Sequence, residues 1–442
     1  MIILKIPRVV IGGSNSGSGK TTVVCALVKA LKDRGLKVSA AKCGPDFIDP
    51  MFHGKILGVP STNIDLYFQD RHMACSLLAE HASGSDITLI EGVMGYYDGI
   101  SYDSDKASTY EVASVTDTPA VIVMNAKGAS LTVSAIIRGI LKFRKNSGIK
   151  AVILNNITSG VYKMIKSVIE KETGIKVIGY LPYDRCFSFE SRYLGLKIPN
   201  DKILETIEVL GKTAAQTIDI DELISISEYA GELPVNDIGI NFIGNARIAV
   251  ALDEAFCFYY KYNLELLKKM GAEISYFSPI KDRHLPDNTD GIILGGGYPE
   301  LYAEELSANV DLINQIRTEM ESGMPCLAEC GGFMYLNKYI NGKKMVGIFD
   351  GNSFNTGKLT RFGYIELKSD KRTFNGIKGH EFHYWDTDNN GDECLAVKPN
   401  GKRSWQCMRK YKNVLAGFPH LYYYSKPEFA EEFIKKCRRN KI

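Results

Sequence analysis

Short apolar runs alternate with segments of helical spacing along the first part of the chain. The apolar runs have the length of buried strands, and they lie at residues 9–12, 38–41, 87–91, 120–125, 151–155 and 177–181. Residues 21–34 and 131–145, which lie between such runs, repeat apolar side chains at the spacing of an amphipathic helix. This alternation is typical of a parallel sheet covered by helices on both faces. We therefore predict an α/β N-terminal domain with a doubly wound parallel sheet.

The pattern weakens over residues 201–240 and then resumes. An acidic stretch at residues 219–222, and the lack of a strong strand before residues 238–242, favour a linker or domain boundary. The next strands are predicted at residues 247–252, 273–277, 291–294 and 325–328, with helices at residues 258–270 and 303–322. A chain of 442 residues is also longer than one hydrophobic core usually supports. We predict two α/β domains, at residues 1–240 and 246–442.

The composition is that of an ordinary soluble globular protein, with 45% hydrophobic and 24% charged residues. The ten cysteines have no repeated spacing, which favours a reducing compartment and argues against a structural zinc site. No apolar run reaches the roughly 20 residues of a membrane helix, and the apolar N-terminus is interpreted as a strand, so we expect a cytoplasmic protein. A net charge of +3 without a dense basic stripe gives little reason to expect nucleic-acid binding.

A glycine- and serine-rich loop connects the first predicted strand to the first predicted helix, at residues 12–22. This context is the one that a phosphate-binding loop requires. We expect Lys20 to reach the β and γ phosphates of ATP and the Thr21 hydroxyl to bind Mg²⁺. The spacing is a variant of the motif, because Ser14 stands where the first glycine belongs and Gly13 lies one residue earlier. The residues expected to hold ATP are Gly13, Ser16, Gly17, Ser18, Gly19, Lys20, Thr21 and Thr22.

Carboxylates follow the next predicted strands. Asp46 and Asp49 lie in the loop after the second strand, and Glu91 ends the third. Loops at the carboxyl ends of parallel strands form the ligand crevice of such sheets, so we expect these carboxylates to approach the phosphate loop. One or two of them, with Thr21, would suffice for Mg²⁺. Asp46 or Asp49 could instead cap the next helix, and Asp98, a candidate substrate residue, could be only a turn residue.

Cys330 stands at a sharp break between an apolar run and paired glycines. The sequence Pro-Cys-Leu-Ala-Glu-Cys-Gly-Gly at residues 325–332 is typical of a strand that ends in a nucleophile elbow. We expect a helix N-terminus there to lower the thiol pKa and favour attack on a carbonyl. The alternatives are a buried structural cysteine and a tight glycine loop without function. The candidates for an oxyanion hole are Gly295, Gly296, Gly297 and Gly331.

A thiol nucleophile needs a base, and few histidines are available in the second domain. His420 lies in a late run from which a loop can return to Cys330, so it is the first candidate. His380, His383 and His284 are the others. His380 and His383 have a metal-like spacing, but residues three apart on a strand face opposite sides, which argues against a shared metal.

Together these motifs resemble the cobyrinic acid a,c-diamide synthase family, in which a dethiobiotin-synthetase-like ATP domain is joined to a class I glutamine amidotransferase domain. The resemblance covers nearly the whole chain and depends on the order of segments that are each weak alone. These segments are residues 14–22, 44–50, 91–98, 190–196, 248–260, 295–301, 327–336 and 379–384. The resemblance implies a P-loop NTPase-like N-terminal domain and a flavodoxin-like C-terminal domain.

The resemblance also implies the chemistry. Cys330 would attack the side-chain amide of glutamine, with His420 as base. The products of this step would be a glutamyl thioester and free ammonia. ATP would phosphorylate a corrin carboxylate, and ammonia would displace phosphate to amidate the a and c acetate groups of cobyrinate, in the anaerobic route to cobalamin. The residues implied at the metal are Thr21, Asp46 and Glu91, with Asp49 orienting substrate or metal.

The sequence departs from the ordinary class I triad at Tyr422, where an acid is expected two residues after the base. The group that orients His420 is therefore open, and this departure is typical of the cobyrinate branch. Arg192, Lys42 and Asp98 are candidates for contact with the polycarboxylate ring.

Other functions share some of these motifs. Nickel-sirohydrochlorin and hydrogenobyrinate a,c-diamide synthases carry out the same chemistry on other rings. A module that uses ATP to assemble on surfaces would share the phosphate loop but give Cys330 and His420 no purpose. We expect ATP, glutamine and a tetrapyrrole as small-molecule partners, and neither nucleic acid nor membrane. The oligomeric state is open, with a homodimer as one alternative.

Overall fold

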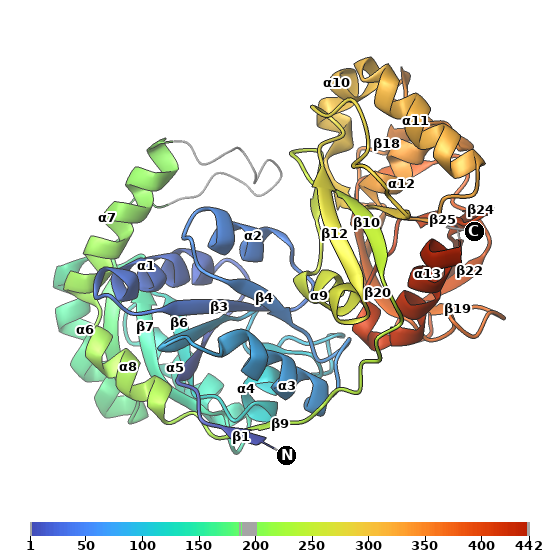
Figure 1. Ribbon diagram of the computed structural model, residues 1–442. Helices are drawn as coiled ribbons and strands as arrows, with labels where there is room; N and C mark the ends of the chain where they lie inside the picture. Colours follow the sequence, from blue (N-terminus) through green and yellow to red (C-terminus); the bar gives the residue numbers. More distant parts are fainter. Residues whose placement is uncertain (1, 185–186, 188–200, 440–442) are drawn as a thin grey trace. The chain divides into compact units, whose positions relative to one another are not determined.

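The computed structural model describes residues 2–184, 187 and 201–439, and the chain divides into two compact units (Figure 1). The first unit spans residues 1–238 and the second residues 239–442. The predicted substrate residue Arg192 and the motif at residues 190–196 lie outside the described residues. Within the described ranges, no helix combines the length and the apolar character needed to cross a bilayer.

A seven-stranded parallel sheet forms the centre of the first unit, in the order β4-β3-β5-β2-β6-β7-β8. Its strands are β2 (Arg8–Gly13), β3 (Val38–Cys43), β4 (Ser61–Ile64), β5 (Ile87–Glu91), β6 (Ala120–Asn125), β7 (Ile149–Asn155) and β8 (Lys176–Leu181). All but β4 were predicted. The Ser-Thr-Asn-Ile sequence of β4 looks polar, yet Asn63 is buried because its side-chain amide donates to the carbonyls of Gly44 and Asp46.

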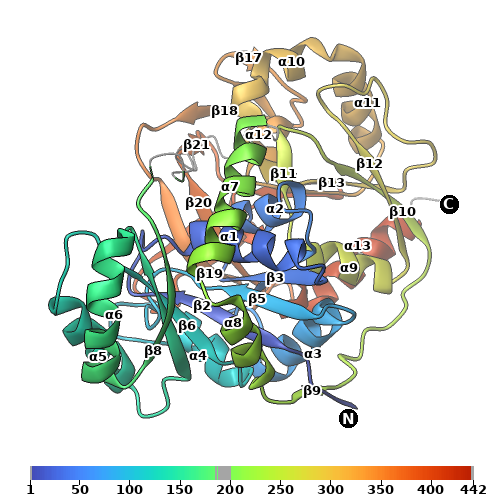
Figure 2. The same ribbon diagram turned by 90° about the vertical axis from the view of Figure 1, so that its left-hand side faces the viewer.

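Helices cover both faces of this sheet (Figure 2). Successive strand residues point to opposite faces, so Val9 and Ile11 join the apolar cluster under α1, whereas Val10 joins the cluster under α3 and α4. The helices are α1 (Lys20–Asp33), α2 (Ile48–Lys55), α3 (Arg71–Ala82), α4 (Thr109–Val115), α5 (Thr132–Phe143), α6 (Ser159–Thr173), α7 (Asp201–Thr217) and α8 (Ile220–Glu228). The predicted doubly wound arrangement is confirmed.

Most of residues 201–240 form helices and are not a linker, whereas the two compact units divide within this range, after Ile238. They include α7 and α8, whose Ile207 and Leu223 enter the same core cluster as α1. The acidic stretch that suggested a boundary is a helix start. Asp219 accepts a hydrogen bond from the backbone N–H of Glu222, and carboxylates in the first turn suit the positive end of a helix. β9 (Leu233–Val235) then pairs with β1 (Ile2–Leu4), and the predicted strand at residues 238–242 is absent.

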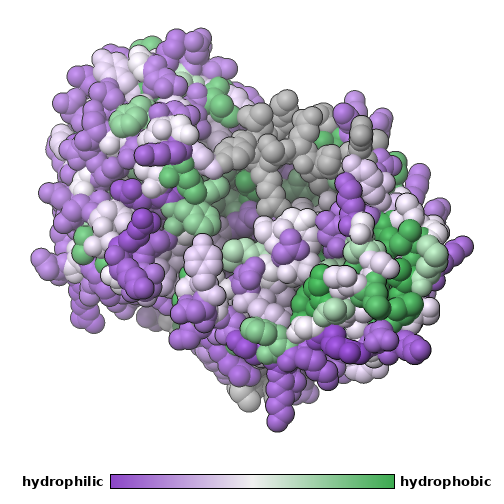
Figure 3. Space-filling model, turned by 180° about the vertical axis from the view of Figure 1, so that it is seen from behind, coloured by the Kyte–Doolittle hydropathy of each residue, from purple (hydrophilic) through white to green (hydrophobic). Residues whose placement is uncertain are grey.

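The helix pair α5 and α6 carries apolar side chains on its outward surface as well as toward the sheet. Val133 and Ile137 of α5 are buried, whereas Ile136 and Phe143 are exposed, as is Met164 of α6. Figure 3 shows hydrophobic side chains gathered on one part of the surface of this unit. α5 is therefore apolar on more than one face.

The second unit contains two larger sheets. The first has the order β12-β10-β13-β15-β25-β24 and is parallel except for the edge strand β24. The second has the order β23-β22-β19-β20-β26 and is antiparallel. Their strands are β10 (Ala246–Ala251), β12 (Ala272–Phe277), β13 (Gly291–Leu294), β15 (Cys326–Glu329), β19 (Arg361–Lys368), β20 (Lys378–His383), β22 (Cys394–Val397), β23 (Ser404–Cys407), β24 (Arg409–Tyr411), β25 (Val414–Gly417) and β26 (His420–Leu421).

Helices and short strands complete the second unit. The predicted helix at residues 303–322 is two helices, because the side-chain amide of Asn309 donates to the carbonyls of Pro279 and Asp282 at the break. The predicted helix at residues 258–270 begins later, after a short strand. These elements are β11 (Phe256–Phe258), α9 (Lys261–Lys269), β14 (Gly296–Gly297), η3 (Pro299–Tyr302), α10 (Ala303–Ala308), α11 (Val310–Glu321), α12 (Gly331–Leu336), β16 (Asn337–Ile340), β17 (Lys343–Lys344), β18 (Phe349–Asn355), β21 (Trp385–Thr387), η4 (Tyr423–Ser425) and α13 (Pro427–Arg439).

Candidate active sites

The phosphate loop joins β2 to α1 and is shaped by its glycines. Gly17 and Gly19 have positive φ angles of 78° and 94°, in the left-handed region that favours glycine. A Cβ atom on Gly13 would lie 2.3 Å from Oγ of Ser18, and one on Gly19 would lie 1.9 Å from Nδ2 of Asn155. The loop backbone therefore approaches its neighbours as closely as only glycine permits.

Lys20 begins α1 and turns back over the loop. Its Nζ donates to the carbonyls of Asn15 at 3.2 Å and Met94 at 2.5 Å. Oγ of Ser18 is buried and has no hydrogen-bond partner among the described residues. A lysine, an unpartnered buried hydroxyl and a helix N-terminus without acidic residues in its first turn together fit a phosphate group. Of the other predicted residues, Ser16 and Gly17 are exposed in the loop, and Thr21 and Thr22 lie in the first turn of α1.

Glu91, at the end of β5, is the centre of a buried polar cluster. Its Oε1 accepts from the Thr21 hydroxyl at 2.7 Å and from the Lys42 ammonium at 2.9 Å. Its Oε2 lies 3.1 Å from Nε2 of His53, and Lys42 also lies 2.6 Å from Oδ2 of Asp49. None of the four charged or titratable side chains is more than 3% exposed. The structure thus brings Thr21, Asp49 and Glu91 together.

Charge pairing sets the protonation of this cluster. Burial alone would raise the pKa of Glu91, but Lys42, His53 and Thr21 hold that pKa well below its ordinary value. Burial alone would lower the pKa of Lys42, but the charges of Glu91 and Asp49 raise it. An ionised carboxylate beside a threonine hydroxyl is a donor pair that fits Mg²⁺. Lys42 is placed to hold the two carboxylates, and its burial argues against the predicted contact with substrate.

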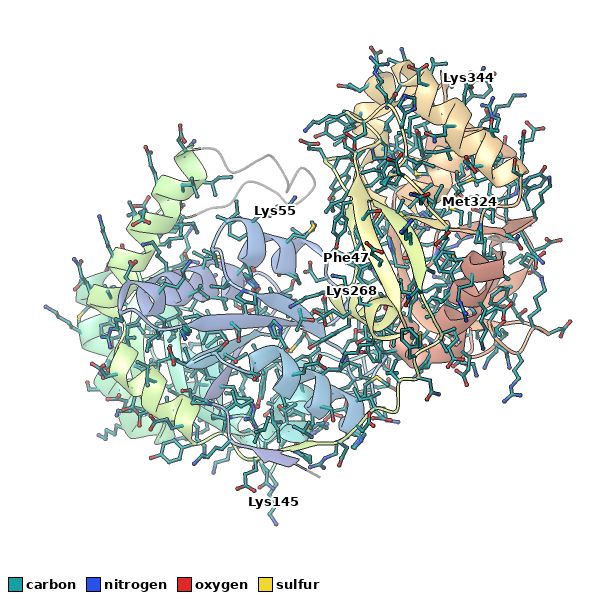
Figure 4. All side chains as sticks on the ribbon, in the orientation of Figure 1. Phe47, Lys55, Lys145, Lys268, Met324 and Lys344 are labelled. Atoms are coloured by element: carbon teal, nitrogen blue, oxygen red, sulfur yellow. The ribbon has the colours of Figure 1, made fainter. Side chains whose placement is uncertain are left out.

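Asp46 and Asp98 both accept hydrogen bonds from nearby backbone amides. Oδ1 of Asp46 accepts from two N–H groups at the start of α2, at 2.8 and 3.2 Å. This helix follows Phe47 and ends at Lys55, and both residues are labelled in Figure 4. Oδ2 of Asp98 accepts from the N–H of Gly95 at 2.7 Å and closes a turn. These contacts match the capping and turn roles that the sequence left open as alternatives.

Cys330 occupies a strained turn between β15 and α12. Its φ of 49° and ψ of −104° are unusual for a residue with a side chain. Its N–H donates to the carbonyl of Gly417 at 2.8 Å, and the residue is 7% exposed. Burial raises the pKa of the thiol and the charge of Glu300 raises it further, whereas the N–H of Gly331 only partly offsets them. The helix N-terminus thus acts on the thiol pKa in the predicted direction, through Gly331, but burial outweighs it and the pKa is raised rather than lowered.

The triple-glycine loop, residues 295–297, packs against this turn and against His420. A Cβ atom on Gly331 would lie 3.2 Å from the amide nitrogen of Gly297. A Cβ atom on Gly296 would lie 2.4 Å from Cε1 of His420. The turn that carries the candidate nucleophile and the ring of the candidate base therefore border the same loop.

Gly295 differs from the rest of this loop, because its N–H donates to Oη of Tyr259 at 2.8 Å. The Tyr259 hydroxyl donates in turn to the carbonyl of Ala251. Burial raises the pKa of Tyr259, so the phenol stays neutral and keeps this donor. The amide of Gly295 thus fixes the loop. The remaining candidates for the oxyanion hole are Gly296, Gly297 and Gly331.

His420 lies beside two side chains that the sequence did not link to it. The ring of His380 stacks on it, with centroids 5.0 Å apart and 20° between the planes. Oε2 of Glu329 lies 3.8 Å from Nδ1 of His420. His383 pairs instead with Glu381 at 2.8 Å, on the other face of β20. In the part of the chain that the structure describes, no three His, Cys, Asp or Glu side chains form a group that could hold a metal.

Two polar residues in these clusters were missed by the sequence analysis. His53 lies four residues after Asp49 in α2, and this spacing puts both on one helix face, a signal that could have found it. Glu329 directly precedes Cys330, but it sits in a buried strand where no spacing marks it as functional.

Comparisons with known proteins match both units. Residues 9–193 match the CobQ/CobB/MinD/ParA nucleotide binding domain, and residues 247–428 match the CobB/CobQ-like glutamine amidotransferase domain. A cobyrinate a,c-diamide synthase of Picrophilus torridus is 39% identical and covers 98% of this chain and 99% of the relative. Its namesake from Clostridium acetobutylicum is 38% identical, with 97% and 99% covered. The chain belongs to the cobyrinate a,c-diamide synthase family.

Membership of the cobyrinate a,c-diamide synthase family confirms the predicted resemblance, the fold class and the enzyme class, a glutamine-dependent amidotransferase of the ligase type. Its nucleotide-binding domain implies the use of ATP. A crystal structure of a glutamine amidotransferase is 15% identical, with a TM-score of 0.34 over 44% of this chain and 99% of that chain. That likeness adds nothing to the family assignment, which depends on the full-length relatives.

Proposed function

We propose that the protein amidates the a and c acetate carboxylates of cobyrinate to give cobyrinate a,c-diamide, in the anaerobic route to cobalamin. The observation that carries this proposal is the 39% identity across 98% of the chain to an enzyme of that name. The proposal includes ATP, Mg²⁺ and glutamine, a cytoplasmic location, and neither a nucleic-acid nor a membrane partner. A homodimer is kept as an alternative to a monomer.

In the first unit, the phosphate loop and Lys20 would hold the triphosphate of ATP. Thr21 and Glu91, with Asp46, would hold Mg²⁺, which when bound offsets the negative charge of the phosphates. The substrate carboxylate attacks the γ phosphorus, the bond to the bridging oxygen of ADP breaks, and an acyl phosphate forms. Ammonia then adds to the acyl carbon and phosphate leaves. Lys42 supports this site by keeping Glu91 ionised.

In the second unit, His420 would take the proton of the Cys330 thiol as sulfur attacks the amide carbon of glutamine. The amides of Gly296, Gly297 and Gly331 would donate to the oxyanion. His420 then returns the proton to the departing ammonia, and water hydrolyses the thioester to glutamate. Because burial raises the thiol pKa, little thiolate forms until glutamine is in place.

Two other rings remain candidate substrates. Nickel-sirohydrochlorin and hydrogenobyrinate carry acetate groups that the same chemistry could amidate. Purified enzyme offered each ring beside cobyrinate, with ATP, Mg²⁺ and glutamine, should form a doubly amidated product with the highest kcat/KM on cobyrinate. A higher kcat/KM on another ring would contradict the proposed substrate. No amidation of any ring would contradict the proposed function.

An ATP-driven assembly module is the alternative from another class. It makes no use of a thiol nucleophile, so Cys330→Ser separates the two. The proposed enzyme should lose glutamine-dependent synthesis in this variant and keep synthesis with added ammonia. Glutamine-dependent synthesis that survives the substitution would show that the nucleophile is wrongly assigned.

A further inference from the structure

We propose that Glu329 is the positioning residue that orients His420, in place of the acid that Tyr422 replaces. Glu329 is the last residue of β15 and directly precedes Cys330, so one strand end delivers both the nucleophile and the partner of its base. Oε2 of Glu329 lies 3.8 Å from Nδ1 of His420, and the two residues are 8% and 2% exposed. This inference depends on the proposed roles of Cys330 and His420.

Glu329 is held from its other oxygen. The hydroxyl of Tyr423 donates to Oε1 at 3.3 Å. Burial raises the pKa of Tyr423, and the charge of Glu329 raises it further, so the phenol keeps its proton and remains the donor. The carboxylate is thus anchored by Oε1 and presents Oε2 to the imidazole.

The segment that carries His420 is fixed by Asn263 of α9. Its Nδ2 donates to the carbonyl of Leu421 at 2.7 Å, and its Oδ1 accepts from the N–H of Tyr423 at 2.8 Å. Asn263 is 6% exposed. The side-chain amide of Asn263 therefore fixes the backbone of Leu421, which follows the base, and of Tyr423, which anchors Glu329.

The position of Tyr422 explains why the acid lies elsewhere. Tyr422 is fully buried, with its ring edge-to-face on Tyr260 at 5.3 Å between centroids. A carboxylate at this position would be placed among aromatic rings, where its desolvation would be costly. Glu329 instead approaches the imidazole from the end of β15, in the other sheet, where the hydroxyl of Tyr423 donates to it.

A carboxylate at Nδ1 would favour the tautomer with its proton on that nitrogen. Nε2 is then the basic nitrogen, and the imidazolium formed after proton transfer is stabilised. The 3.8 Å separation is longer than a hydrogen bond, and such contacts often tighten when substrate binds or the base becomes charged. Two titratable side chains flank His420, Glu329 from β15 and His380 from β20. Burial lowers the pKa of His380, so it adds no charge.

Glu329→Gln tests the inference, with Glu381→Gln as the matched variant of the neighbouring buried His–Glu pair. In Glu329→Gln, kcat for glutamine hydrolysis should fall by about 10- to 100-fold, because the base remains but is not oriented. The acidic limb of its pH profile should move to lower pH, since a negative charge no longer favours the protonated imidazole. Glu381→Gln should leave that limb in place. An unmoved limb with kcat within about twofold of the parent would overturn the role of Glu329.

Parallel variants separate this inference from the proposed function. Glutamine-dependent synthesis that persists in Cys330→Ser and His420→Asn would refute the proposed nucleophile and base. Loss of activity in those two, with full activity in Glu329→Gln, would refute only the inference. Ammonia-dependent synthesis reports whether each variant folds. If Glu329→Gln does not fold, Tyr423→Phe decides, because a lower kcat at unchanged KM supports the anchor and an unaltered kcat overturns it.

Discussion

The hydroxyl of Thr21 donates to Oε1 of Glu91 at 2.7 Å, so the first turn of α1 and the end of β5 meet at one carboxylate oxygen. Lys42 binds the same oxygen at 2.9 Å. This oxygen therefore links the phosphate loop to the buried charges behind it. Its removal should affect both stability and phosphoryl transfer.

Glu91→Gln should abolish synthesis with ammonia as well as with glutamine, because it removes a proposed metal ligand. It should also lower the free energy of unfolding by about 3 kcal/mol, since it breaks a buried ion pair and leaves Lys42 only Asp49. Urea unfolding and ammonia-dependent turnover measure the two effects. Glu228→Gln, at the exposed end of α8, is the control and should change neither. Normal ammonia-dependent turnover in Glu91→Gln would contradict the role of this carboxylate.

Gly19→Ala and Gly17→Ala separate backbone strain from close contact in the phosphate loop. Both glycines have a positive φ, so either substitution should cost about 1 kcal/mol in strain. Only Gly19 faces a neighbour, because its Cβ would lie 1.9 Å from Nδ2 of Asn155, whereas the Cβ at Gly17 meets nothing within 4 Å. Gly19→Ala should therefore be less stable by at least about 2 kcal/mol and bind ATP poorly. Thermal unfolding and ATP titration test this, and equal losses in both variants would contradict it.

Most strands of the parallel sheets could be predicted because buried strands have continuous apolar sequences, although β4 and β25 were missed. The antiparallel sheet of the second unit could not, because a strand such as β19 places Ile365 and Leu367 inside between more exposed neighbours, a weaker signal over a short length. The helix α7 was missed although Ile207, Leu210 and Ala214, which are buried in the same core cluster as α1, recur at helical spacing in the sequence.

The proposed sites were predictable where chemistry follows a motif and not where it depends on tertiary contact. Lys20 and Thr21 follow a glycine-rich loop after a predicted strand, and Cys330 follows a predicted strand and precedes paired glycines, so the sequence alone points to them. Lys42 contacts carboxylates from two other elements, and Glu329 contacts a histidine that lies on a different strand. Neither has a spacing along the chain that sequence analysis can detect.

Cys330 should react slowly with iodoacetamide near neutral pH in the absence of glutamine. Burial raises its thiol pKa, so the reactive thiolate is scarce until the solution is strongly alkaline. The alkylation rate, followed by mass spectrometry of the peptide that contains Cys330, should keep rising above about pH 9, with no plateau at lower pH. The Cys330→Ser variant identifies labelling at other cysteines. A plateau below pH 7 would mean that the free enzyme already holds a thiolate.

Glu300→Gln should stabilise the protein at pH 8 and have little effect at pH 4. Burial raises the pKa of Glu300 from 4.5 to about 7, so the folded state holds a proton that the unfolded chain has already lost between these values. Stability contributed by this group is therefore complete below about pH 4.5 and declines as pH rises toward 7, by up to about 3 kcal/mol. A glutamine side chain cannot ionise, so the Glu300→Gln variant does not lose this stability as pH rises.

Glu304→Gln is the matched control. Lys343 lowers the pKa of Glu304, so this substitution should destabilise the protein at pH 8 instead of stabilising it. Urea unfolding of both variants at several pH values measures the difference, and a pH-independent effect of Glu300→Gln would contradict the burial of this carboxyl group.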